Sequence, residues 1–193
     1  MVKYTEDYYL DILKKNLTEK RYHHCLCVRD EAVRLAKKYG ADEKKAYWAG
    51  LLHDVTKDSD REYHFSVFEK YGYLPDELTK KEKKLWHAKS GALLLKNELG
   101  VTDDEIISAI DCHTTAKPNM TLLERVLYIA DFTSSDRDYN GIEEIRAAAD
   151  ESLEAAMDIA LTFTVTDLVE RRKAVHPDTF NAYNDFVIKN ERK

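Results

Sequence analysis

Apolar residues recur at intervals of three or four positions along nearly the whole chain, which is the spacing of amphipathic α-helices. In the first half, this pattern predicts helices over residues 5–16, 18–39, 42–53, 60–72 and 87–99. Thr18 and Asp42 are residue types that cap helix N-termini, and Gly40 stands where a helix C-terminus favours glycine. The first half of the chain is therefore predicted to be almost entirely helical.

The next part of the chain contains two predicted capping boxes and one predicted loop. Thr102 and Thr121 each stand three residues before a glutamate, and this spacing marks a helix N-terminus. The stretch 114–119 has no helical pattern and contains a proline, so it is predicted to be a loop between these two helices. The helical pattern thus continues past the middle of the chain.

Prolines and turn residues divide what remains. Residues 72–82 carry a proline within a charged stretch and are predicted to form a loop, and 139–141 form a turn. Residues 143–172 supply one or two helices, and Pro177 suits the first turn of a final helix. With no internal repeat or convincing linker, the sequence predicts one all-α domain over residues 1–193.

Composition narrows the class of protein. The 193 residues include 44% hydrophobic and 34% charged residues, as in a globular protein with a proper core. The net charge of −6 argues against DNA or RNA as the main partner. The three cysteines fit no disulfide or zinc-knuckle spacing and are predicted to be reduced thiols. Because we find neither an apolar signal core nor a membrane-spanning run, we expect a cytoplasmic protein without membrane contacts.

Imidazole and carboxylate side chains recur in or beside the predicted helices at long intervals. In chain order they are His24, His53, Asp54, His87, His113 and Asp131. These side chains are ligands of borderline and hard divalent metals, and residues so far apart form one site only through the fold. Each histidine taken alone is more often a hydrogen-bonded core or surface residue than a ligand. Their joint occurrence is what predicts a metal site.

Helical geometry indicates where some of these side chains point. At about 100° per residue, His24 lies at the border of an apolar stripe that also holds Arg21. A histidine and an arginine in such a place are expected where a core opens into a pocket. Lys57 follows His53 by four residues and is predicted to share its face of the helix.

Asp131 ends the apolar run 126–131 and so differs from an ordinary surface carboxylate. A carboxylate in apolar surroundings needs a cation or several hydrogen-bond donors. From the sequence, Asp131 can therefore either form a salt bridge or bind a metal. Two other histidines are not predicted to be ligands. His23 faces the helix flank, and His64 lies in an amphipathic stretch without a carboxylate partner.

Five segments carry a closer likeness to a known family: 17–24, 49–58, 109–115, 128–131 and 175–179. Together with the ordered histidine and aspartate series, they resemble the HD superfamily of helical metal-dependent phosphohydrolases. Within it they resemble the YqeK-type family of bacterial symmetrical diadenosine tetraphosphate hydrolases. The resemblance implies a single HD-domain helical bundle with a metal core at about 18–135 and C-terminal helices over 142–190 that complete a nucleotide pocket.

The resemblance also implies roles for particular residues. It makes His24, His53, Asp54 and Asp131 the core ligands of one or two divalent ions, with iron the implied metal. His87 and His113 would hold a second metal or the phosphate beside it. Arg21, Lys57, Thr114 and Arg137 match positions that contact nucleotide phosphates, and the segment around His176 borders the nucleoside. A homodimer is implied as well.

The chemistry of the implied reaction fits these residue types. Hydrolysis of a phosphoanhydride needs a nucleophilic water at neutral pH and positive charge near the phosphoryl oxygens, and a bound metal supplies both. We therefore expect Asp54 to anchor the water, while Lys57 and Arg137 neutralise charge in the transition state. Attack at the phosphorus next to the central bridge of diadenosine tetraphosphate releases two ADP.

Three other functions remain open from the sequence. The first is another HD phosphohydrolase that acts on a nucleoside monophosphate, a deoxynucleoside triphosphate or a cyclic dinucleotide. The second is a helical module that binds a nucleotide or metal without turnover, and the third is a di-iron oxygenase. The phosphate-contacting residues favour the dinucleoside polyphosphate over the other substrates, and the complete ligand series argues against a module without turnover.

Overall fold

The computed structural model describes residues 1–190, and the expectation of one domain over 1–193 extends past them at 191–193. The all-α prediction is confirmed, because these residues form eleven α-helices and one 3-10 helix. In chain order they are α1 (Glu6–Asn16), α2 (Glu19–Tyr39), α3 (Glu43–Leu52), α4 (Arg61–Lys70), α5 (Glu77–Lys81), the 3-10 helix η1 (Lys83–Leu85), α6 (Trp86–Asn97), α7 (Asp104–Cys112), α8 (Leu122–Thr133), α9 (Ile142–Glu151), α10 (Leu153–Glu170) and α11 (Pro177–Lys189).

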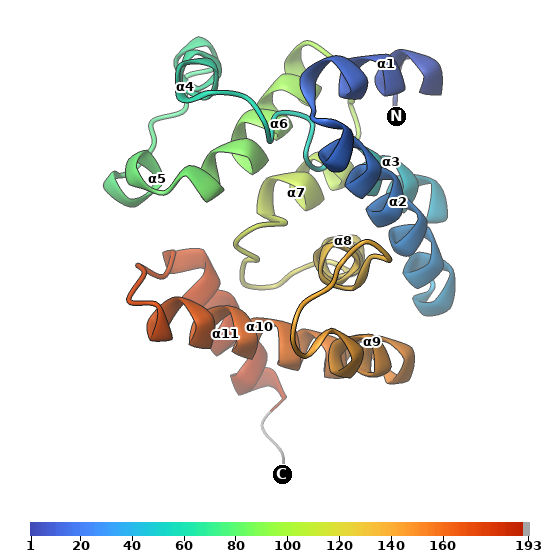
Figure 1. The fold of residues 1–193 in the computed structure, drawn as a ribbon, viewed down its shortest axis with the longest axis vertical. Coiled ribbons are helices and arrows are strands. Elements are labelled where there is room, and N and C mark those ends of the chain that lie inside the picture. The colour runs from blue at the N-terminus through green and yellow to red at the C-terminus, as the bar shows by residue number, and fades with distance from the viewer. Residues whose placement is uncertain (191–193) are drawn as a thin grey trace.

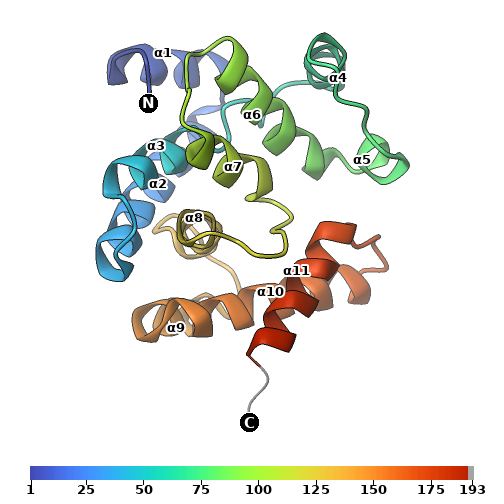
Figure 2. The same cartoon turned by 180° about the vertical axis from the view of Figure 1, so that it is seen from behind.

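Helix α8 occupies the centre of the molecule (Figure 1). It contacts α2 and α3 on one side, α7 on another, and α9 and α10 on a third. The view from behind shows the same arrangement, with α4 packed beside α6 at the edge of the molecule (Figure 2). Helix α8 is central because apolar side chains cover it almost all round, and its residues 126–130 are all buried.

Side-chain caps explain where several helices begin. Thr5, Thr18 and Asp42 each accept a hydrogen bond from a backbone N–H of the helix that follows. Gly40 ends α2 with a φ of 78°, in the left-handed region that glycine adopts readily. The capping box predicted at Thr121 is present, because Thr121 and Glu124 each bind the other's backbone N–H.

The capping box predicted at Thr102 is wrong. Helix α7 begins at Asp104, and Asp103 caps it by accepting from the backbone N–H of Glu105 at 3.1 Å. Thr102 has a different partner, since its backbone N–H and its hydroxyl both donate to the carbonyl oxygen of Met1. A contact with the distant N-terminus therefore overrides the local capping signal.

Two other local predictions need correction. Part of the stretch predicted as a loop forms the short helix α5, because Asp76 accepts a hydrogen bond from the backbone N–H of Thr79 and caps it. The helix expected to reach His53 ends at Leu52, and residues 53–58 form successive turns instead. Over residues 1–190, none of the helices is both long and apolar enough to cross a membrane.

Candidate functional site

The six predicted histidines and aspartates meet at one place, where the ends of several helices converge. His53 and Asp54 follow the end of α3, His87 lies in the first turn of α6, and His113 directly follows α7. His24 projects from α2 and Asp131 from the last turn of α8. Five of these side chains are almost fully buried, whereas the Asp131 side chain is 21% exposed. The cluster therefore lies in the core but opens to the surface at Asp131.

One half of the cluster contains His24, His53 and Asp131. Their candidate ligand atoms all lie within 4.8 Å of one another. Nε2 of His24 is 3.0 Å from Oδ1 of Asp131, and Nε2 of His53 is 4.0 Å from the same oxygen. Two imidazole nitrogens and a carboxylate oxygen at such separations can ligate one ion.

The other half contains His53, Asp54 and His113, whose ligand atoms also lie within 4.8 Å of one another. His87 joins this half, because its Nε2 is 3.1 Å from Oδ1 of Asp54 and 3.1 Å from Nε2 of His113. His53 belongs to both halves. The cluster is thus elongated, with His24 and Asp131 at one end and His87 and His113 at the other.

The residues present fit a divalent metal on their own chemistry. Nε2 of His53 and Oδ1 of Asp54 are buried and have no hydrogen-bond partner. Nδ1 of His53 and Nδ1 of His113 each donate to a backbone carbonyl at 2.7 Å, so each Nε2 carries a lone pair in the neutral ring. Buried lone pairs without donors are costly in an apolar core, and a cation among them removes that cost.

His24 gives a second indication of a cation site. Both of its ring nitrogens face carboxylates, Nδ1 at 2.8 Å from Asp136 and Nε2 at 3.0 Å from Asp131. A neutral imidazole has a single N–H and can donate to only one of them. If Nδ1 donates to Asp136, Nε2 presents a lone pair beside Asp131, which is the arrangement of a histidine ligand oriented by a carboxylate.

Three cationic side chains surround the cluster. Arg21 donates to Oδ2 of Asp54 at 2.9 Å, and the Lys57 ammonium lies 3.8 Å from Oδ1 of the same residue. Arg137 binds the Asp131 carboxylate and also donates to the Asp131 backbone carbonyl at 2.7 Å. These groups supply positive charge at the edge of the site, which favours an anionic ligand there.

The charges of the cluster shift the pKa values of its members. Burial acts to raise the pKa of Asp54, but His53, His87 and Lys57 together hold it well below its usual range. Burial lowers the pKa of Lys57, against the opposing effect of Asp54. Burial also lowers the pKa of His87 to about 3, so its ring is neutral near pH 7. A neutral imidazole and an ionised carboxylate are the forms that bind metals.

Thr114 and His176 lie farther out. The Thr114 hydroxyl is 3.2 Å from Nε2 of His87 and 3.3 Å from Nε2 of His113, at the outer edge of the cluster. His176 does not reach the cluster. It lines a cavity of about 180 Å³ together with Thr114, Phe163 from α10 and Leu168. The C-terminal helices thus border a hollow that extends outward from Thr114.

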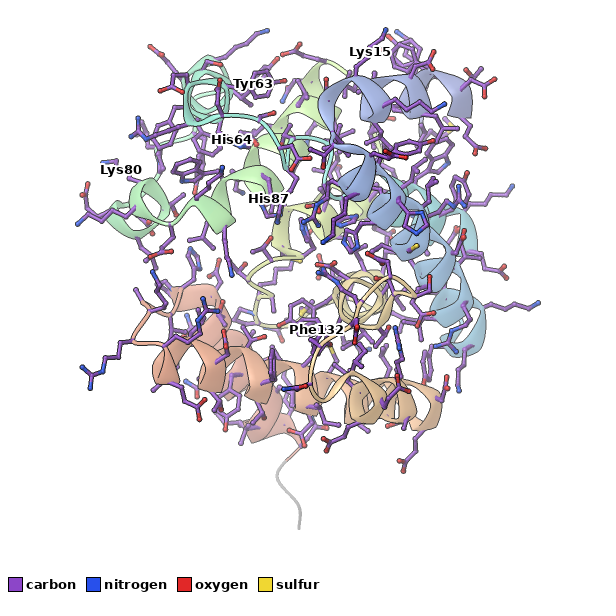
Figure 3. The ribbon with its side chains drawn as sticks, viewed as in Figure 1. Lys15, Tyr63, His64, Lys80, His87 and Phe132 are labelled. Atoms are coloured by element: carbon purple, nitrogen blue, oxygen red, sulfur yellow. The ribbon has the colours of Figure 1, made fainter. Side chains whose placement is uncertain are left out.

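Asp136 supports the cluster by orienting His24, a role that was not predicted from the sequence. The only sequence signal for it is its position next to Arg137 in the segment after α8. The two histidines set aside in the sequence do lie elsewhere. His64 is buried, with Nδ1 2.7 Å from the Ser90 hydroxyl, and so lies outside the cluster, as expected. Figure 3 shows His64 and His87 on neighbouring helices, and His23 is exposed on the surface, as expected.

Comparisons with known proteins agree with this geometry. The HD domain family matches residues 21–136. The symmetrical bis(5'-nucleosyl)-tetraphosphatase of Bacillus subtilis is 38% identical over 92% of this chain and 95% of its own length. The protein of that name from Halalkalibacterium halodurans is 36% identical, over 93% of this chain and 95% of its own length.

A solved structure has the same fold. The crystal structure of a predicted HD superfamily hydrolase involved in NAD metabolism, from Clostridium acetobutylicum, superposes with a TM-score of 0.93 at 36% identity. The match covers 97% of this chain and 99% of the Clostridium acetobutylicum chain. The chain therefore belongs to the HD domain family, in the branch that contains these symmetrical bis(5'-nucleosyl)-tetraphosphatases.

Proposed function

We propose that this protein is a divalent-metal-dependent hydrolase that cleaves diadenosine tetraphosphate, and related symmetrical dinucleoside tetraphosphates, into two nucleoside diphosphates. The observation that carries this proposal is the buried cluster around His53, with unpartnered ligand atoms inside and cations at its edge. A phosphate chain needs positive charge on both sides of the bond that breaks, and the cluster is arranged to supply it. The names of the relatives identify the substrate class.

The ligands of the metal are assigned on the same basis. His24, His53, Asp54 and Asp131 would hold the ion, and His87 and His113 would hold a second ion or the phosphate beside it. A bound divalent metal contributes Lewis acidity and acidifies a coordinated water. We expect one or two ions, and iron is the metal we propose because the family resemblance implies it; mixed imidazole and carboxylate ligands are compatible with iron.

The protein's own side chains have three further tasks in this proposal. Asp54 is held ionised and can orient the attacking water through its carboxylate oxygens. Lys57 and Arg137 are placed at the edge of the cluster, where they neutralise charge that develops on the phosphoryl oxygens. Arg21 and Thr114 bind phosphates of the substrate, because a guanidinium and a hydroxyl are donors suited to phosphate oxygens.

Direct attack by water is favoured over a covalent intermediate. Cys25 is the thiol near the cluster, and burial together with the Asp54 charge raises its pKa well above the usual range. A thiol that stays protonated is a poor nucleophile. The C-terminal helices 142–190 are proposed to complete the nucleotide pocket, with the His176 cavity receiving one nucleoside.

A homodimer and a cytoplasmic location belong to the same proposal. Val169, Phe180 and Ile188 of the C-terminal helices are exposed apolar side chains, of the kind that a dimer interface covers. The net charge of −6 supports a small-molecule partner rather than nucleic acid. Sedimentation equilibrium measures the oligomeric state directly, and a monomer at micromolar concentration would contradict the dimer.

The test of function is a product analysis in labelled water. Metal-replete protein is incubated with a panel of dinucleoside polyphosphates, nucleoside monophosphates, deoxynucleoside triphosphates and cyclic dinucleotides in ¹⁸O water. We expect diadenosine tetraphosphate to give two ADP, one of which carries a single labelled phosphate oxygen. An AMP and ATP pair would reject symmetrical cleavage, and label outside the ADP phosphate would reject direct attack by water.

A further inference from the structure

A symmetrical dinucleoside tetraphosphate carries two identical nucleosides, one at each end of its phosphate chain. If it is cut at the centre, the bond that breaks lies over the metal cluster, and the nucleosides extend from it in two directions. The His176 cavity accounts for one nucleoside, and it approaches the cluster through Thr114, at the end that contains His87 and His113. The second nucleoside needs a place at the opposite end.

A second cavity of about 180 Å³ opens at that opposite end. Its polar wall consists of Asp131 and Arg137, and its other walls are the aromatic rings of Phe132, Tyr139 and Phe163. Figure 3 shows Phe132 on the side of α8 that faces α10. A hollow with the Arg137 guanidinium beside the metal cluster and three aromatic rings in its lining suits a nucleotide, with its phosphates on one side and a flat base on the other.

The aromatic walls are arranged as surfaces for a base. The rings of Tyr139 and Phe163 are nearly parallel, with an angle of 28° between their planes and 6.0 Å between their centroids. Phe132 meets Phe163 edge to face at 6.4 Å. Phe163 is 45% exposed, so its ring is accessible to a ligand. Nucleobases stack on such rings whatever the pattern of hydrogen-bond donors and acceptors on the edge of the base.

The segment that carries Arg137 and Tyr139 is held in place by the protein. The Tyr139 hydroxyl donates to the backbone carbonyl of Phe132 at 3.0 Å. From α9, the guanidinium of Arg146 donates to the carbonyl oxygens of Thr133, Ser134 and Arg137 at 2.8 to 3.1 Å. Binding a base here therefore requires little ordering of the segment.

We propose that the cavity of Phe132, Tyr139 and Phe163 is the second nucleoside subsite, which stacks a purine base while Arg137 binds the adjoining phosphate. Phe163 lines this cavity and also the His176 cavity, so its ring borders both nucleoside subsites. This inference rests on the proposed function, since it takes the symmetrical substrate as given. The two identical nucleosides of the substrate thus bind in two different cavities of one chain.

The test counts binding sites for ADP and does not depend on turnover. Isothermal titration of the metal-replete protein with ADP should give two sites per chain. Tyr139→Leu and Phe132→Leu keep an apolar side chain but remove the ring, and each should leave one site and weaken the other about tenfold to a hundredfold. Tyr8→Leu, at an exposed position of α1, is the matched control and should keep both sites. Circular dichroism verifies the fold of each variant.

A kinetic comparison provides the second measurement. Adenosine 5′-tetraphosphate has the same phosphates as diadenosine tetraphosphate but lacks one nucleoside. For Tyr139→Leu, kcat/KM should fall about tenfold to a hundredfold with diadenosine tetraphosphate and change by less than about threefold with adenosine 5′-tetraphosphate. The wild type alone should prefer the dinucleoside by about tenfold or more.

The outcomes separate this inference from the proposed function. Two ADP sites that persist in both ring variants, or an equal fall with both substrates, would overturn the second subsite. A single ADP site in the wild type would overturn it as well. A wild type that cleaves no dinucleoside tetraphosphate but loses one of two ADP sites in Tyr139→Leu would reject the proposed function and support the subsite.

Discussion

The ammonium group of Lys57 lies 3.0 Å from Nε2 of His87, although the two residues come from a turn after α3 and from the first turn of α6. Because an ammonium only donates, Nε2 of His87 must accept, and the ring must be neutral. The low pKa of about 3 at His87 agrees with this. The ammonium is also 3.8 Å from Asp54, so Lys57 directs its charge into the buried cluster.

Replacement of Lys57 tests whether this charge acts in the transition state. We expect Lys57→Ala to lower kcat with diadenosine tetraphosphate by roughly two to three powers of ten, because a charge next to the phosphoryl oxygens is lost. Elemental analysis should find the metal content unchanged. Lys37→Ala removes an exposed lysine of α2 and should leave kcat as it was. Normal turnover in Lys57→Ala would remove this residue from the mechanism.

The position of His53 in both halves of the cluster predicts an order of metal loss. His53→Ala removes a ligand atom from both candidate sets, whereas His24→Ala and His113→Ala each remove one from a single set. We expect His53→Ala to retain the least metal after dialysis, with far-ultraviolet circular dichroism close to that of the wild type.

The control for metal loss is the neighbouring histidine. His23 is exposed and lies next to His24 in the sequence, so His23→Ala should bind metal normally. Inductively coupled plasma mass spectrometry measures the ratio of metal to protein in all four variants, His53→Ala, His24→Ala, His113→Ala and His23→Ala. Full occupancy in His53→Ala, or an equal loss in His23→Ala, would contradict the assignment of the ligands.

Local signals in the sequence were sufficient for most of the fold. Helix boundaries at Thr18, Gly40, Asp42 and Thr121 depend on a residue and its near neighbours, and all four agree with the structure. The histidine and aspartate series was recognisable because the residue types and their order are specific. It predicted residues that the fold does bring together, without any knowledge of how the helices pack.

The sequence did not predict features that depend on a contact between residues far apart along the chain. Thr102 has the pattern of a cap but bonds to Met1, 101 positions away along the chain. Asp136 orients His24 across 112 positions, and no periodicity signals such a pair. Arg146 fixes the Arg137 segment through backbone carbonyls, which have no sequence signature. Contacts of this kind become visible only when the helices are placed.

Gly50 allows close contact between α2 and α3. A Cβ atom at this position would lie 2.7 Å from Cα of Arg29 and 3.0 Å from the carbonyl oxygen of Val28, so the backbones would have to separate. We expect Gly50→Ala to reduce the free energy of unfolding by about 2 kcal/mol in urea denaturation. It should also weaken metal binding, because the Gly50 carbonyl accepts the hydrogen bond that orients His53.

Gly91 provides the matched comparison for this effect. It is also helical, but the nearest atom to its added Cβ is a side-chain methyl of Val55 at 3.3 Å. A methyl group can shift, and alanine has the better helix propensity, so Gly91→Ala should change stability by less than about 1 kcal/mol. Equal stability of Gly50→Ala and wild type would show that the two helices can separate without cost.

His64 predicts a specific dependence of stability on pH. Burial lowers the pKa of His64 from 6.5 to about 4, and its ring is 1% exposed beside Ser90. In the unfolded chain this histidine takes up a proton below about pH 6.5, whereas in the folded chain it stays neutral until about pH 4. The contribution of His64 to the free energy of unfolding is therefore fully present above about pH 6.5. It is lost progressively as the pH falls to about 4, by an amount on the order of 3 kcal/mol.

Replacement of His64 by glutamine separates this effect from all other titrations. The glutamine side chain is neutral in both states, so the curve of unfolding free energy against pH for His64→Gln should be shallower than that of the wild type between about pH 6.5 and 4. Urea denaturation of the metal-free proteins at several pH values supplies both curves, and removal of the metal prevents the cluster histidines from adding a metal-linked slope. The remaining groups titrate alike in the two proteins, so their difference isolates His64. Parallel curves would mean that the buried ring accepts a proton as readily in the folded chain as in the unfolded one.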